Sequence, residues 1–310
     1  MKTYTLERGL SIIDVAPPIR GFEQFISIYV LEAGKVALVD VGPSVSVVNL
    51  VAGLQQLKVS PGDVSYVFIS HIHLDHAGGI GRVLKQIPNA NVVVHEKGAP
   101  HLIDPTKLWA DSQRALGEVA EKYEPLEPVP EDRVIVGRDG MVFDLGGMKL
   151  EVLETPGHAS HHLSFWDNQK KRLFVGEAAG VYTAEVDLTR PGTPAPFNLE
   201  QSLESLDRLI QLAPVSLCYG HFGCAPQPLD RLRTAKQQLI LWSKIIAACV
   251  EEGLSIEDMY PRIREADAML ARLDGILADR RDRELYFIDN SIKGLVGYFE
   301  KFGTGLVKQL

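Results

Sequence analysis

The chain has 310 residues, which suits one large domain or two smaller ones. Hydrophobic residues make up 45% and charged residues 23%, as in soluble globular proteins, and the net charge of −8 disfavours nucleic-acid binding, which calls for clustered Lys and Arg. The N-terminus lacks the apolar core of a signal peptide and no stretch is apolar enough to span a membrane, so we expect a cytoplasmic protein with no membrane contact.

The first half of the chain is predicted to alternate strands with helices. Residues 25–31 and 35–40 flank Ala33-Gly34 as a β-hairpin. The elements expected next are a helix over 45–57, a strand over 64–70, a helix over 78–86, a strand over 92–95 and a helix over 105–124, before a proline-rich loop at 124–130.

The second half begins with a further run of strands and ends in helices. The strands are expected at 141–144, 148–153, 162–166, 172–175 and 215–219, with a helix over 198–212 that Asn198 caps. Helices alone are predicted beyond residue 228, over 229–252, 255–277 and 291–302. We therefore expect a catalytic part at 1–227 and a helical extension at 228–310, which serves as a lid or as the surface of a homodimer.

The cysteines give no disulfide framework. Cys218, Cys224 and Cys249 are an odd and small number in a chain of this length. They are predicted to be buried, free thiols, and the first two flank His221, where a redox role is conceivable.

The segment His71-Ile-His-Leu-Asp-His76 is the strongest functional signal, because it puts three imidazoles and a carboxylate into one short loop. It follows a predicted buried strand and precedes a helix, where ligands bind in α/β folds. In an extended backbone the side chains of His71, His73 and Asp75 would point to one side and that of His76 to another. One loop could therefore provide ligands for two metal ions. Burying such a cluster without a metal would be costly.

Three further candidate ligands follow strands in the second half. His158, Glu177 and His221 each come after a predicted strand and directly after a glycine. Each residue alone has ordinary structural explanations, such as a packed imidazole or a solvated carboxylate. Their repeated strand-Gly-ligand pattern favours a shared site with the 71–76 cluster.

Taken together, these motifs resemble the metallo-β-lactamase-fold superfamily. The resemblance rests on the 71–76 cluster, Thr155-Pro-Gly-His158, Gly176-Glu177 and Gly220-His221 in the family's order, with Asp40 at the family's early Asp-x-Gly element. It implies an α/β protein with an αββα sandwich and the active site on one edge, here followed by the helical C-terminal extension.

The resemblance also implies a role for each motif residue. The expected ligands of the first metal are His71, His73 and His158; those of the second are Asp75, His76 and His221; Glu177 takes the bridging position. It further implies that Asp40 hydrogen-bonds a ligand imidazole and that His162 is structural or supports a ligand, while His95 and His101 match nothing in the pattern.

Glu177 departs from the family, whose hydrolytic members usually have Asp at the bridging position. The added methylene shifts the carboxylate by about 1.5 Å. This shift would change the metal spacing, change the preferred metal, or leave Glu177 on one ion only.

These residues predict a dinuclear metal-dependent hydrolase acting on a small ester, lactone or thioester. Two divalent ions, zinc in the first place with iron or manganese as alternatives, would hold a hydroxide between them. Asp75 is the candidate proton shuttle, and Tyr182 resembles in position a tyrosine with which lactone-hydrolysing members contact the substrate carbonyl. The alternatives are an iron-dependent redox enzyme of the same fold, a small-molecule phosphodiesterase and a non-catalytic binding module.

Overall fold

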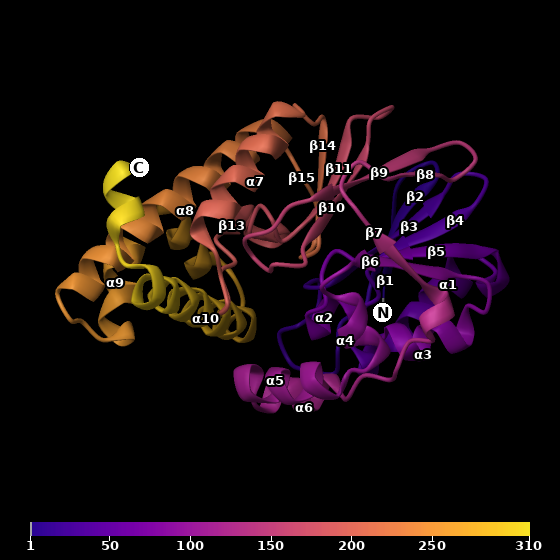
Figure 1. Cartoon of the computed structure of the whole chain (residues 1–310), viewed down its shortest axis with the longest axis horizontal. Coiled ribbons are helices and arrows are strands. Elements are labelled where there is room, and N and C mark those ends of the chain that lie inside the picture. Colours follow the sequence, from indigo (N-terminus) through magenta and orange to yellow (C-terminus); the bar gives the residue numbers. More distant parts are fainter. Residues whose placement is uncertain (1) are drawn as a thin grey trace.

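Two β-sheets packed face to face form the centre of the molecule in a computed structural model that describes residues 2–310 (Figure 1). Met1, the first residue of the expected catalytic part, lies outside the described residues. The larger sheet consists, in spatial order, of β1 (Lys2–Glu7), β2 (Leu10–Asp14), β3 (Ser27–Glu32), β4 (Val36–Val39), β5 (Val64–Phe68), β6 (Asn91–His95) and β7 (Val134–Gly137). The smaller sheet has the order β15 (Gly223–Ala225), β14 (Ser216–Tyr219), β11 (Arg172–Gly176), β10 (Leu163–Asp167), β9 (Lys149–Glu154) and β8 (Val142–Asp144). A separate hairpin pairs β12 (Val181–Thr183) with β13 (Leu188–Arg190).

Helices cover the outer face of each sheet, which gives the predicted αββα sandwich (Figure 1). They are α1 (Val47–Gln56), α2 (Leu74–Ala77), α3 (Ile80–Gln86), α4 (Ala99–Ile103), α5 (Thr106–Leu116), α6 (Glu118–Tyr123), α7 (Leu199–Gln211), α8 (Pro228–Glu251), α9 (Ile256–Ala266) and α10 (Ala278–Phe302). In the described part of the chain, none of them combines the length and apolar character needed to cross a membrane.

Three hydrophobic clusters hold these layers together. The cluster between the sheets contains Phe68 and Phe165, whose ring centroids lie 5.2 Å apart. A second cluster packs α1 and α3 on the larger sheet. The third joins the smaller sheet to α7 and to the C-terminal helices, with Trp242 fully buried in it. The helical extension thus shares its core with the sandwich.

Two predicted helices are interrupted in the structure. The helix expected over 105–124 is divided into α5 and α6 by Gly117, whose φ of 54° favours glycine. The helix expected over 255–277 ends at Ala266, because the Asp267 carboxylate accepts hydrogen bonds from Trp242 Nε1 and from the backbone N–H of Met269 and starts a 3-10 segment. Both breaks depend on backbone geometry that apolar periodicity does not report.

Other boundaries also differ from the sequence-based expectations. The last helix, expected over 291–302, is the 25-residue α10 and begins at Ala278. Strands β1, β2, β7, β12, β13 and β15 have no counterpart among the predicted elements. The expected cap of α7 is confirmed, since Asn198 Oδ1 accepts a hydrogen bond from the Gln201 backbone N–H at 3.0 Å.

Candidate metal centre

The seven predicted ligands converge at one end of the sandwich, and each lies at or beyond the carboxyl end of a strand. His71 and His73 lie on the extended segment after β5, whereas Asp75 and His76 lie on the first turn of α2. The expected strand-like alternation therefore stops at His73, and this expectation is corrected for Asp75. The remaining three follow their strands as expected: His158 follows β9, Glu177 follows β11 and His221 follows β14.

The ligand atoms form two groups. Within each group, one potential ligand atom from every residue lies within 4.8 Å of all the others. The first group consists of His71, His73, His158 and Glu177, and the second of Asp75, His76 and His221.

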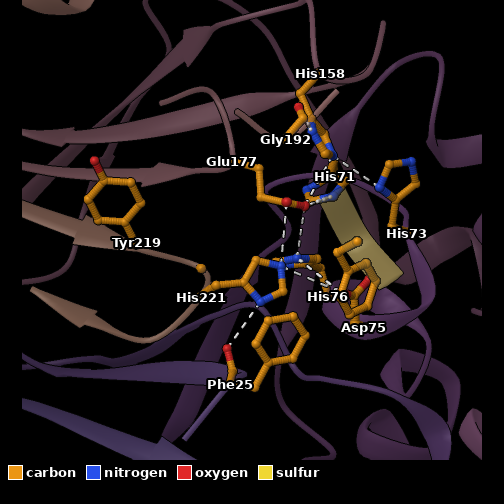
Figure 2. A network of polar contacts seen from close by, with 12 residues as sticks. Phe25, His71, His73, Asp75, His76, His158, Glu177, Gly192, Tyr219 and His221 are labelled. Carbon is orange, nitrogen blue, oxygen red and sulfur yellow. Dashed lines mark hydrogen bonds and ion pairs between the residues drawn. The ribbon is translucent and has the colours of Figure 1, made fainter. Parts of the chain in front are cut away.

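The Glu177 carboxylate lies between the two groups (Figure 2). Its Oε2 atom is 3.3 Å from His71 Nε2, 3.1 Å from His158 Nε2 and 3.4 Å from His76 Nε2. Its Oε1 atom is 3.5 Å from His221 Nε2. The longer glutamate side chain therefore reaches imidazoles of both groups.

Four of the five imidazoles have their Nε2 atoms towards the centre, whereas His73 presents Nδ1, which lies 3.1 Å from His158 Nε2. His158 Nδ1 donates to the Gly192 carbonyl at 2.9 Å, and His221 Nδ1 donates to the Phe25 carbonyl at 3.1 Å. With the proton on Nδ1, Nε2 keeps its lone pair for a metal. The Nε2 atoms of His71 and His76 are buried without a hydrogen-bond partner among the described residues. Buried atoms of this kind are normally paired, so this donor set fits a bound cation.

Asp40 fixes two of these imidazoles. Its Oδ2 atom accepts from His76 Nδ1 at 2.9 Å and from the Ser70 hydroxyl at 2.8 Å. Because Ser70 donates to Asp40, its oxygen is left to accept from His71 Nδ1 at 3.1 Å. The predicted hydrogen bond between Asp40 and a cluster imidazole is confirmed.

Replacement of Asp40 by asparagine is expected to lower metal affinity by about tenfold to a hundredfold, as loss of a hydrogen bond behind a ligand typically does. The amide keeps the shape of the side chain but cannot accept at every position that Asp40 uses. Competition with a chromophoric chelator measures the affinity, and Asp63→Asn, at an exposed carboxylate, is the control. Equal affinity in the Asp40 variant and the wild type would refute this role.

The electrostatics of the cluster suit a cation. Burial, reinforced by the neighbouring imidazoles, holds the pKa of His71 and that of His73 well below the ordinary value, so both are neutral at pH 7. Burial alone would raise the pKa of Glu177, but His158 and His221 outweigh it and hold that pKa well below its usual value. Neutral His71 and His73 beside an ionised Glu177 are in the protonation states that metal binding requires. His76 differs: burial lowers its pKa, but Asp75, Asp40 and Glu177 outweigh burial and raise it well above the ordinary value, so a metal at this position would displace a proton.

His162 supports Glu177 and belongs to neither group, in line with its expected role. Its Nε2 atom accepts from the Glu177 backbone N–H at 3.1 Å, and its Nδ1 atom lies 2.9 Å from the Thr155 hydroxyl. The residue before Glu177 must be glycine here, because Gly176 has φ +54° and a Cβ would lie 2.6 Å from His162 Nε2. The glycine of the Gly-Glu motif thus has a steric cause.

The remaining histidines lie outside the two groups. His95 is buried and accepts from the Lys97 backbone N–H, and His101 lies on α4. His161, which no sequence pattern singles out, has its ring centroid 6.1 Å from that of His73. Burial and the nearby His158 lower the pKa of His161 to about 4.

The structure does not bring Tyr182 to the cluster, which corrects the expected contact with a substrate carbonyl. Side chains alternate along β12, so Val181 faces the cavity beside the cluster and Tyr182 faces the other way. The Tyr182 ring packs against Tyr219, and its hydroxyl donates to Asp187 Oδ1 at 3.1 Å.

A cavity of about 120 Å³ adjoins the cluster. Its wall includes His73, Asp75, His158, Glu177 and His221 together with residues of α5, α6, β13 and α10. Most of the other side chains in the wall are apolar, which is typical of sites for small organic ligands.

The αββα sandwich and the two adjoining groups of histidine and carboxylate side chains assign the protein to the metal-binding class of proteins with this fold. The metallo-beta-lactamase superfamily model matches residues 21–221, and the chain belongs to this superfamily.

Proteins similar to this chain share the fold. The metallo-beta-lactamase fold-containing protein ST1585 of Sulfurisphaera tokodaii is 31% identical over 221 residues, 70% of this chain and 79% of its own. The solved structure of the metallo-beta-lactamase family protein TTHA1429 from Thermus thermophilus superposes with a TM-score of 0.70 at 24% identity, over 96% of this chain and 95% of that one.

Two further relatives have names that state an activity. The atrochrysone carboxyl ACP thioesterase of Aspergillus fumigatus is 25% identical over 228 residues, 70% of this chain and 59% of its own. The N-acyl homoserine lactonase AttM of Agrobacterium fabrum is 31% identical over 131 residues, 41% of this chain and 45% of its own.

Proposed function

We propose that the protein is a dinuclear metal-dependent hydrolase of a small ester, thioester or lactone. The observation that carries the proposal is the convergence of five imidazoles and two carboxylates, two of the imidazoles with unpaired buried Nε2 atoms, on the wall of a mainly apolar cavity. The superfamily, and the thioesterase and the lactonase among the relatives, support this class of reaction.

The two groups are the proposed ligand sets for two ions. His71, His73 and His158 would hold one, Asp75, His76 and His221 the other, and Glu177 would contribute to both. When bound, divalent ions of this kind acidify a water to a pKa of about 7 and polarise the bond that the water attacks.

The chain's own residues have distinct tasks in such a reaction. Asp75 Oδ2 lies 3.7 Å from His76 Nε2 and 3.6 Å from His221 Nε2, so this oxygen would serve the metal and Oδ1 would take the proton of the attacking water and pass it to the leaving alkoxide or thiolate. Phe25 stacks on His221, with ring centroids 4.2 Å apart, and keeps that imidazole in place. The apolar wall binds the carbon skeleton of the substrate and limits the access of bulk water.

Elemental analysis followed by a hydrolysis panel tests the proposal. We expect two equivalents of metal per chain and hydrolysis of at least one of three probes, 4-nitrophenyl butyrate, a butyryl thioester and γ-butyrolactone. The activity should disappear with EDTA and return with Zn²⁺, because the nucleophile depends on the metal.

Two results would favour the alternatives. Stoichiometric iron without hydrolysis of any of these probes would contradict the hydrolase and favour a redox enzyme of the same fold. Hydrolysis of bis(4-nitrophenyl) phosphate alone would favour a phosphodiesterase.

A further inference from the structure

The cavity wall also contains a buried arginine that is not a metal ligand. Arg190, at the end of β13, is 2% exposed and lines the cavity together with Phe287 and Asn290 of α10. None of these residues belongs to the two ligand groups. Their position indicates a role towards the part of a substrate that does not contact metal.

The Arg190 guanidinium is only partly hydrogen-bonded. Nε donates to Glu284 Oε2 at 2.6 Å, and Nη1 makes a long contact of 3.4 Å with the Pro191 carbonyl. Nη2 is buried and has no partner among the described residues. A guanidinium can only donate, and a buried donor without an acceptor is costly, so an acceptor from a ligand would relieve this cost.

The buried cluster of Arg190, Arg283 and Glu284 has a net positive charge. Glu284 lies between Arg190 and Arg283, and all three side chains are buried, so two cations and one anion leave a single positive charge. Arg283 is fully engaged: it donates to Glu284 and to the Gly21 carbonyl, and it lies over the Phe25 ring. Arg190 therefore has the free donor of this buried cluster.

A second unpartnered donor lines the same cavity. The hydroxyl of Tyr123 on α6 is buried and has no hydrogen-bond partner among residues 2–310. Phe25 and Phe287, with ring centroids 5.3 Å apart, form an apolar part of the wall. The wall of the cavity on this side thus combines an apolar surface, two free donors and one cation, Arg190, whose only carboxylate partner is shared with Arg283.

From these contacts we infer that the cavity selects substrates that carry a carboxylate in addition to the bond to be hydrolysed, and that Arg190 binds this carboxylate. The inference rests on the proposed function, because it names the substrate class of the same site. Tyr123 supplies a further hydrogen bond to an oxygen of the bound substrate. Neither Arg190 nor Tyr123 takes part in the chemical step; both determine specificity.

A matched pair of substrates tests the inference. The acid 4-nitrophenyl hydrogen glutarate and its methyl ester have the same scissile bond and differ in charge. We expect the wild type to prefer the acid, and we expect R190Q to reduce the ratio of the two kcat/KM values by about tenfold to a hundredfold, the worth of a charged hydrogen bond. The ratio is independent of the folded fraction, so a loss of stability does not imitate this result.

Two further variants separate recognition from a structural role. R190K keeps the charge but loses the planar fork, so we expect an intermediate ratio. Arg281 lies on the same helix as Glu284 and forms no ion pair or side-chain hydrogen bond with described residues, so R281Q should keep the wild-type ratio. An unchanged ratio in R190Q, or a wild type that prefers the diester, overturns the inference.

Binding provides a readout that does not depend on turnover. Calorimetric titration of the metal-loaded protein should show tighter binding of hexanoate than of hexanamide, with this advantage lost in R190Q. A carboxylate that binds only at the metal would keep its advantage in R190Q and would refute the role of Arg190. If neither ester is hydrolysed while hexanoate depends on Arg190, the proposed function fails and the carboxylate site stands.

Discussion

Replacement of Glu177 by alanine is expected to lower kcat/KM for the proposed hydrolysis by about 10³-fold or more, since metal ions contribute several kcal/mol to such reactions. The same change should reduce the bound metal to one equivalent or less. The reason is the position of the carboxylate, which lies 3.1–3.5 Å from imidazoles of both ligand groups. Steady-state kinetics and elemental analysis of the purified variant measure the two effects.

Glu177→Asp keeps the carboxylate but shortens the side chain, so it tests whether the length of the side chain matters. Aspartate is shorter by about 1.5 Å and would withdraw from at least one group if the backbone stays in place. We expect metal content and kcat/KM between those of the wild type and the alanine variant. His101→Ala, outside both groups, is the matched control and should retain both metals. An alanine variant with two metals and wild-type turnover would rule out the shared carboxylate.

Glu284→Ala is expected to lower the free energy of unfolding by about 3–5 kcal/mol, because it leaves two buried guanidinium groups without their counter-charge. Glu284 is fully buried and accepts hydrogen bonds from Arg190 and Arg283. Urea unfolding measures the change. Asp282→Ala removes an exposed carboxylate of the same helix and should change the midpoint little.

The pH dependence of unfolding reports on the same contact. Burial alone would raise the pKa of Glu284, but Arg190 and Arg283 outweigh it and lower that pKa from 4.5 to about 2. A carboxyl group whose pKa is lower in the folded than in the unfolded state stabilises the folded state at pH values above the unfolded-state pKa. This stabilisation is lost as the pH falls towards the folded-state pKa. The wild type should therefore lose about 3 kcal/mol more than Glu284→Ala between pH 4.5 and pH 2. Parallel pH profiles would contradict this assignment.

The sequence predicted those parts of the site that depend on short-range patterns. The 71–76 cluster is visible because its ligand types are only a few residues apart, and each later candidate follows a buried strand and a glycine. Their meeting in space was inferred from the repeated strand-Gly-ligand pattern and from the family resemblance, since the separation along the chain between His71 and His221 carries no geometric information. Glu177 was noted as a departure from the family's usual aspartate, and the structure adds that its longer side chain reaches both groups.

Sequence patterns did not predict which residues line the cavity. Tyr182 was selected because it resembles in position a tyrosine of lactone-hydrolysing members, but strand alternation turns it away from the cavity. Tyr123 is in the wall because Gly117 ends α5 and redirects the chain into α6, and neither residue belongs to a recognisable motif. Arg190 belongs to none of the motifs found in the sequence, and its partner Glu284 lies 94 positions further on.

The contact between β13 and α10 also sets an order of events during synthesis. All seven candidate ligands have left the ribosome once the chain has passed His221, whereas Glu284, Phe287 and Asn290 follow some 60–70 residues later. At bacterial or eukaryotic elongation rates this interval lasts roughly 3–14 s. A nascent chain of this protein would thus have the residues of its metal centre before the wall that holds the substrate, and an ion could be bound before the cavity closes around it.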